Sequence, residues 1–120
     1  MTRKNAVEIY SLLRELKSGG MNKEALTAFI LMRMKLKAVF DSFESARQEI
    51  SEQTKPEWQD ELENTEEWNA AFQPVIEKWL SEEVDINTNV LTASDLVDII
   101  SKNDLTGGVQ DFLFETLVSN

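Results

Sequence analysis

Residues 25–50 read ALTAFILMRMKLKAVFDSFESARQEI, and this stretch decides the fold. Its apolar side chains recur at alternating steps of four and three positions: Ala25, Phe29, Met32, Leu36, Val39, Phe43, Ala46 and Ile50. That spacing is the heptad period, which places these side chains on one narrow face of a single α-helix. The helix spans about 38 Å at 1.5 Å per residue. An apolar face of this length requires a covering helix, from this chain or from a partner.

The segment before this stretch predicts a shorter helix over about 4–17, closed by the glycine pair at 19–20. Folded back by a short loop, a helix of that length covers only about half of the helix predicted over 23–53. The distal half, from Val39 to Ile50, therefore needs other cover. Two alternatives are open, because either a third helix of the chain or a second copy of the chain could lie there.

A third helix is predicted after an acidic bridge. The bridge holds six acids between positions 57 and 67, and Asn64, Thr65, Glu66 and Glu67 resemble a capping box at the helix start. The apolar face of this helix is rich in large side chains: Trp68, Ala71, Phe72, Val75, Ile76, Trp79 and Leu80. Because a proline removes one backbone hydrogen bond, we expect Pro74 to kink the helix or divide it near Gln73.

The C-terminal third predicts one strand and two short helices. Residues 84–90 alternate apolar and polar side chains with period two, and a strand there needs a partner from this chain or from another protomer. Thr92 caps a helix over 93–102, the glycine pair at 107–108 breaks the chain, and a last short helix follows. The sequence thus predicts a mainly α fold: a long antiparallel helical hairpin, C-terminal short helices and one short β-strand. We expect a single domain over 1–120, composed of the hairpin (1–53), the acidic bridge with the tryptophan-rich helix (54–82), and the strand with the C-terminal helices (83–120).

Composition excludes most catalytic chemistries. The chain of 120 residues contains no cysteine and no histidine, which removes thiolate nucleophiles, thiolate metal sites and the usual general base. No apolar stretch approaches the roughly 20 residues of a membrane span, and the basic N-terminus leads into no signal-peptide pattern. We therefore expect no enzyme, no cofactor, no metal and no membrane insertion.

Charge is distributed unevenly along the chain, whose net charge is −10. Residues 1–37 hold eight basic and three acidic side chains, a net +5, whereas the remainder holds four basic and 19 acidic side chains, a net −15. This field opposes direct nucleic-acid binding. Three interpretations stay open: the basic part packs against the acidic remainder, it binds an acidic partner, or both are solvated surfaces.

Weak motifs in the chain favour structural roles. Asp85, Asn87 and Asn89 match the first ligands of a calcium loop, but Val90 and Leu96 stand where that loop requires glycine and glutamate. The glycine pairs lack the lysine and serine of a phosphate loop. Among the aromatic residues, Trp58 has acidic and polar neighbours, which favours an exposed interface anchor.

Four short motifs, in this order, resemble those of a group of small, uncharacterised bacteriophage and prophage proteins: Asn5-x-x-Glu8-Ile9-Tyr10-x-x-Leu13, Phe43-Glu44-x-x-Arg47, Glu83-Val84-Asp85-Ile86 and Leu91-Thr92-x-x-Asp95-Leu96. The resemblance covers most of the chain except residues 55–80. It implies a helical hairpin followed by a strand and a short helix with an acidic cap. It also implies a structural or assembly-accessory role in the bacterial cytoplasm or the virion, and it transfers no catalytic residue.

The sequence accordingly favours a non-enzymatic protein–protein interaction or assembly protein that forms a homo-oligomer, with a dimer as the first expectation. The alternative is an acidic regulatory or inhibitor protein that binds a basic, nucleic-acid-binding partner. The identity of the protein partner does not follow from the sequence. The predicted interface combines the distal part of the long helix, the exposed tryptophan and the strand: Val39, Phe43, Ile50, Trp58, Val84 and Ile86.

Overall fold

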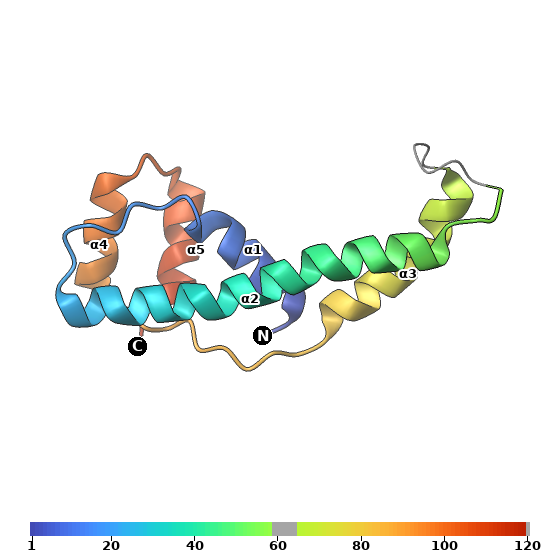
Figure 1. Cartoon of the computed structure of the whole chain (residues 1–120). Coiled ribbons are helices and arrows are strands. Elements are labelled where there is room, and N and C mark those ends of the chain that lie inside the picture. The colour runs from blue at the N-terminus through green and yellow to red at the C-terminus, as the bar shows by residue number, and fades with distance from the viewer. Residues whose placement is uncertain (59–64, 120) are drawn as a thin grey trace.

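The computed structural model of the chain describes residues 1–58 and 65–119, and its regular elements in that part are helices (Figure 1). In chain order they are α1 (Arg3–Leu13), α2 (Lys23–Thr54), α3 (Glu66–Ser81), α4 (Ala93–Lys102) and α5 (Gly107–Leu117). The molecule is elongated, with extents of 56 × 28 × 20 Å. Its length follows from α2, whose 32 residues form a rod of about 48 Å. The predicted mainly α fold with one long helix is confirmed.

The boundaries of α2 follow from local sequence signals. The side chain of Asn22 accepts a hydrogen bond from the Ala25 N–H at 2.8 Å, which caps the N-terminus, and Glu24 lies in the first turn. The helix ends at Thr54, shortly before Pro56. The prediction of a helix over 23–53 is therefore confirmed to within one residue.

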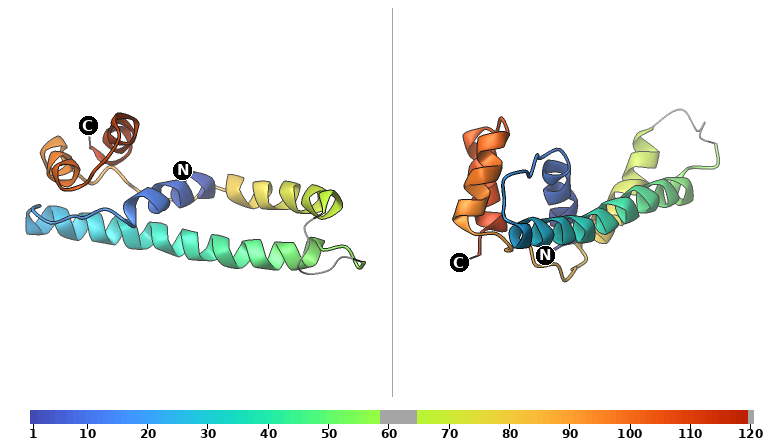
Figure 2. Two further views of the ribbon diagram at one scale, coloured as in Figure 1. Left: turned by 90° about the horizontal axis from the view of Figure 1, so that it is seen from above. Right: turned by 60° about the vertical axis from the view of Figure 1, so that its left-hand side comes forward.

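The helices α1 and α3 lie end to end along one side of α2 (Figure 2). We call residues 43–58 and 65–81 the arm, because there α2 is accompanied by α3 alone. We call residues 1–42 and 82–119 the head, in which α1, α4 and α5 surround the first part of α2 (Figure 1). Of the two alternatives for covering the distal half of α2, the structure shows the third helix of the same chain.

The core lies in the head. Buried side chains from α1, the first half of α2, the segment before α4, α4 and α5 form one cluster: Ala6, Ile9, Leu13, Ala25, Phe29, Met32, Leu36, Leu91, Leu96, Ile99, Leu113 and Leu117. The first four positions of the heptad ladder belong to this cluster. Val39 packs against this cluster as well, whereas Phe43 packs on Trp79 of α3, so the ladder is shared between the head core and the arm.

The first helix is shorter than predicted, since α1 ends at Leu13 rather than near Lys17. The cause is a tertiary contact with the end of α4. The Lys17 N–H donates to Asn103 Oδ1 at 2.9 Å, and Asn103 Nδ2 donates to the Lys17 carbonyl at 2.9 Å. Because one side chain takes both backbone groups of Lys17, residues 16–18 leave the helical path.

The predicted strand over 84–90 is wrong, because within the described residues this segment forms no strand. It is an extended connection that keeps its alternation, with Val84 and Ile86 packed on the core cluster and Asp85 and Asn87 exposed. Isolated bridges tie its two flanks, one to the start of α1 and one to the end of α5. An alternation of apolar and polar residues indicates that every second side chain is buried. Here a single extended segment that lies on helices has this alternation without a partner strand.

Two expectations about helix breakers have different outcomes. Pro74 does not divide its helix, because α3 continues from Glu66 to Ser81 with Pro74 inside it, and a kink at Pro74 stays a prediction. The glycine pair at 107–108 opens α5 instead of breaking the chain, because Thr106 caps that helix. The capping box of Thr92 and Asp95 is present as predicted. For α3, Thr65 is the N-cap, whereas Asn64 lies outside the described residues.

Candidate interaction surface

The arm is held together by a few large side chains between α2 and α3. Phe43 packs on Trp79 with ring centroids 5.9 Å apart, and Ile50 is 8% exposed. At the far end, the indole N–H of Trp68 donates to the Ser51 carbonyl at 2.9 Å. That carbonyl belongs to the last turn of α2, where backbone acceptors lack intrahelical partners. Trp68 therefore both packs α3 and caps α2.

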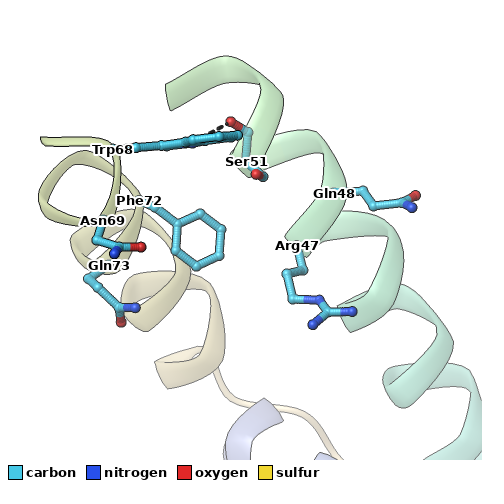
Figure 3. Close-up of a pocket in the computed structure, with 7 residues that line it drawn as sticks. All are labelled: Arg47, Gln48, Ser51, Trp68, Asn69, Phe72 and Gln73. Atoms are coloured by element: carbon cyan, nitrogen blue, oxygen red, sulfur yellow. Dashed lines mark hydrogen bonds between the residues drawn. The ribbon is translucent and has the colours of Figure 1, made fainter. Parts of the chain in front are cut away.

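A shallow groove of about 330 Å³ lies between the two helices of the arm (Figure 3). Phe72 points into the space between α2 and α3, and Trp68 closes one end next to Ser51. Arg47 and several carboxamides complete the lining: Gln48, Asn69 and Gln73. Arg47 is paired with Glu44 at 2.7 Å. The groove is open and mixes aromatic surface with neutral hydrogen-bonding groups, which suits contact with another macromolecule better than chemistry.

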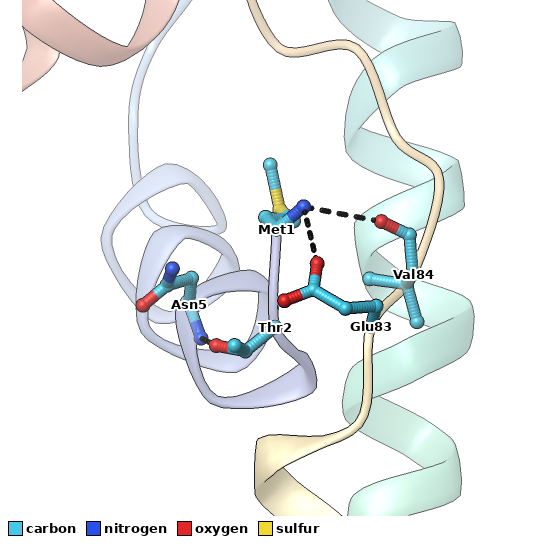
Figure 4. Close-up of polar contacts among 5 residues, drawn as sticks. All are labelled: Met1, Thr2, Asn5, Glu83 and Val84. Atoms are coloured by element: carbon cyan, nitrogen blue, oxygen red, sulfur yellow. Dashed lines mark hydrogen bonds and ion pairs between the residues drawn. The ribbon is translucent and has the colours of Figure 1, made fainter.

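The arm joins the head at the N-terminus of α1. Arg3 lies over the Trp79 ring at 4.2 Å and pairs with Glu82 at 2.9 Å. Backbone bonds reinforce this joint, because the Arg3 N–H donates to the Glu82 carbonyl at 2.9 Å and the Val84 N–H donates to the Met1 carbonyl at 2.8 Å. The Met1 amino group pairs with Glu83 at 3.2 Å and donates to the Val84 carbonyl at 3.3 Å (Figure 4). The joint orients the arm relative to the head.

Five of the six predicted interface residues pack within the chain. Val39, Val84 and Ile86 are half-buried against the core cluster, Phe43 lies on Trp79 and Ile50 is buried. These side chains cover other parts of the same molecule. A homo-oligomer remains a prediction, and these residues offer it little free apolar surface.

Trp58 is the sixth predicted residue and is 64% exposed. It lies in the turn that follows α2, and the C-terminus of α2 forms the end of the arm away from the head (Figure 1). The described acids of the predicted bridge are exposed as well: Glu57, Glu66 and Glu67. Asp60, Glu61 and Glu63 lie outside the described residues. The described end of the arm thus presents one large aromatic side chain among carboxylates.

A basic hollow of about 320 Å³ lies on the border of α1 and α2 in the head, lined by Tyr10, Arg14, Arg33, Met34 and Lys37. Arg14 lies over the Phe40 ring at 5.6 Å, and Arg33 lies over the Phe29 ring at 5.3 Å. The pKa of Lys37 is raised, first by its hydrogen bond with Asp41 and second by the charge of that carboxylate. The hollow therefore gathers three cationic side chains, Arg14, Arg33 and Lys37, which favours an electrostatic role for it.

The predicted packing of basic against acidic segments occurs at the joint, where Arg3 meets Glu82. The ion pairs of Lys37 with Asp41 and of Arg47 with Glu44 are local contacts within one turn of α2. Within residues 1–58 and 65–119, no group of three or more carboxylates is placed to hold a metal ion. The calcium-like side chains are exposed, and Asn87 Oδ1 accepts the Asn89 N–H at 3.1 Å.

The sequence did not indicate the groove of the arm. Its polar side chains come from two helices about 20 positions apart, and no spacing rule connects Arg47 with Asn69 and Gln73. The signal that was present is the aromatic face of the predicted third helix, of which Trp68 and Phe72 form the groove wall.

No protein-family model, curated protein or solved structure matches this chain. In the described part of the chain, no helix combines the length and the apolar character that crossing a membrane requires.

Proposed function

We propose that this chain is a non-enzymatic interaction protein that uses the end of its arm to bind a protein partner. The supporting observation is Trp58, a tryptophan that is 64% exposed in the turn that follows α2. Tryptophan is the side chain most enriched among residues that dominate binding energy at protein interfaces. On the resemblance to phage proteins, we further propose that the chain is a structural or accessory component of a phage or prophage.

The acidic surroundings of Trp58 define the chemistry of this partner. Glu57, Glu66 and Glu67 are exposed near it in sequence. Glu66 and Glu67 also stabilise the N-terminus of α3 through the helix dipole, so their local role is accounted for. A surface with an apolar pocket surrounded by lysine or arginine would complement this end of the arm.

A second candidate follows from the same charges. A basic groove that binds nucleic acid offers the lysine and arginine density that an acidic arm complements. In that case the chain is a regulatory or inhibitor protein that competes with nucleic acid. The salt dependence of binding and competition by DNA distinguish this candidate from an assembly role.

A photo-crosslinking amino acid placed at position 58 in a bacterial host tests the proposal. Position 97 in the head is the matched control, because Val97 is also an exposed apolar residue. We expect a discrete adduct from position 58 that is absent from position 97. The purified adduct partner should then bind the Trp58→Ala variant at least about tenfold more weakly than wild type, and the Val97→Ala variant equally well.

Equal adducts from both positions, or unchanged binding by Trp58→Ala, would contradict the proposal. If the partner is a virion protein, the assembly role is supported and the inhibitor role fails. If the partner binds nucleic acid and DNA competes with the arm, the inhibitor role is supported instead.

A further inference from the structure

A second stripe runs along α2, opposite the heptad ladder, with Met34 at the rim of the basic hollow beside α1 and Gln48 at the rim of the groove beside α3. Its members again alternate steps of four and three, and all are exposed: Thr27, Leu31, Met34, Ala38, Asp41, Ser45, Gln48 and Glu52. Leu31 and Met34 are 55% and 61% exposed, which is high for large apolar side chains on a regular helix. The view from above in Figure 2 shows the other helices on the opposite side of α2. We call this stripe the outer face.

The charges of α2 divide into two halves of opposite sign. Residues 23–37 carry four basic side chains and one acid, whereas residues 38–54 carry four acids and one basic side chain. Lys35 and Lys37 flank the outer face in the first half, and Glu49 and Glu52 lie on or beside it in the second. The net charges of the two halves are therefore equal in magnitude and opposite in sign.

Apart from the Lys37–Asp41 ion pair where the two halves meet, this division does little for an isolated molecule. A straight helix cannot fold one half onto the other, and the half-centres are about 24 Å apart at 1.5 Å per residue, beyond the Debye length of about 8 Å at physiological salt. The acids also lie toward the C-terminus of α2, where the helix dipole favours cations, and the last turn contains no basic residue. An antiparallel copy of α2 would instead place each basic half against an acidic half.

We propose that two copies of the chain associate antiparallel through the outer faces of α2. The arrangement is a two-fold symmetric dimer, because every contact of one basic half with one acidic half occurs twice. Leu31, Met34 and Ala38 supply the apolar contacts, and the charged flanks set the direction of pairing, as e and g positions do in coiled coils. This goes beyond the proposed function, since the end of the arm needs no second copy to bind its partner.

Single cysteines test the geometry, because the chain contains none of its own. In the antiparallel dimer, Ala38 near the middle of α2 meets its own copy, whereas Thr27 lies about 33 Å from its copy at 1.5 Å per residue. Under mild oxidation at low micromolar concentration, we expect Ala38→Cys to form a disulfide-linked dimer and Thr27→Cys to stay monomeric. Cross-linking of both variants, or of neither, would overturn the proposal.

Charge reversal tests the chemistry independently. In one variant the basic half is reversed by Lys35→Glu and Lys37→Glu, and in the other the facing part of the acidic half is reversed by Asp41→Lys and Glu44→Lys. Each variant alone should dimerise at least about tenfold more weakly than wild type, since like charges now face each other. An equimolar mixture should recover dimerisation as a heterodimer.

Sedimentation velocity with one labelled variant measures both the weakened homodimer and the recovered heterodimer. Circular dichroism checks that the helices of each variant are intact. The matched control is Asp111→Lys with Glu115→Lys, which changes net charge equally at exposed positions of α5. This control should dimerise like wild type. A monomeric wild-type chain at 100 µM, or a mixture with no heterodimer, would refute self-association and leave the proposed function of the arm untouched.

Discussion

Replacing Trp68 should loosen the arm while leaving the head folded. Trp68 is 7% exposed, and its indole N–H donates to the Ser51 carbonyl at 2.9 Å. The same carbonyl also accepts a long bond, at 3.4 Å, from the Thr54 hydroxyl. A change at position 68 therefore removes both packing between α2 and α3 and the main acceptor contact at the end of α2.

These contacts set the expected loss in the free energy of unfolding. In Trp68→Phe, loss of one hydrogen bond in a partly buried setting costs about 0.5–1.5 kcal/mol. The smaller ring also leaves space, which brings the expected total to about 1–2 kcal/mol. Trp68→Ala removes the whole ring, and buried aromatic truncations cost about 3–5 kcal/mol.

Hydrogen exchange followed by mass spectrometry locates the loss. Each 1.4 kcal/mol changes an opening equilibrium by about tenfold, so exchange of the α3 amides should accelerate about tenfold in Trp68→Phe and by a hundredfold or more in Trp68→Ala. Amides near Leu96 and Ile99 in the head core should keep wild-type rates. Trp58→Phe is the matched control, because Trp58 is exposed and should affect neither region.

Two results would refute this reasoning. If Trp68→Phe leaves α3 exchange unchanged, the indole N–H contributes nothing at the end of α2. If α3 and the head core accelerate equally in Trp68→Ala, the arm and head unfold as one unit and the joint at Arg3 transmits the loss.

Three smaller perturbations test the head by chemical denaturation. Gly20→Ala should lower the free energy of unfolding by about 1–2 kcal/mol, because Gly20 has φ +97° and a Cβ there would lie 2.8 Å from Lys102 Cε. Gly19→Ala should be near neutral, because a Cβ at position 19 meets nothing within 4 Å. Equal losses of stability in the two variants would contradict a backbone cause. Asn103→Ala should cost about 1–2 kcal/mol, since Asn103 makes three hydrogen bonds to backbone groups; an unchanged denaturation midpoint would show that water replaces those bonds. Gly108→Ala should stabilise by about 0.5–1 kcal/mol, because the added Cβ in the first turn of α5 meets nothing within 4 Å, and a loss of stability would indicate a contact that the structure does not contain.

How far the sequence could predict the site differs from residue to residue. The exposure of Trp58 was expected from its polar and acidic neighbours, because an aromatic residue outside any apolar periodicity has no core to join. The heptad ladder implied that Phe43 and Ile50 would be covered by a helix, and Phe43 is half-buried and Ile50 buried. Which partner buries them was left open, since a heptad seam does not distinguish a helix of the same chain from one of a second copy.

The sequence alone determined the mainly helical fold, the boundaries of α2 and α4, and the N-caps of these two helices. The reason is that capping and periodicity are local: Asn22, Thr92 and Asp95 act within one turn of their own helix. Tertiary structure decided the rest. Asn103 ended α1 early by binding Lys17, 86 positions away in sequence, and the surface under residues 84–90 turned a strand pattern into an unpaired extended segment. These outcomes depend on which segments meet in space, and no local pattern contains that information.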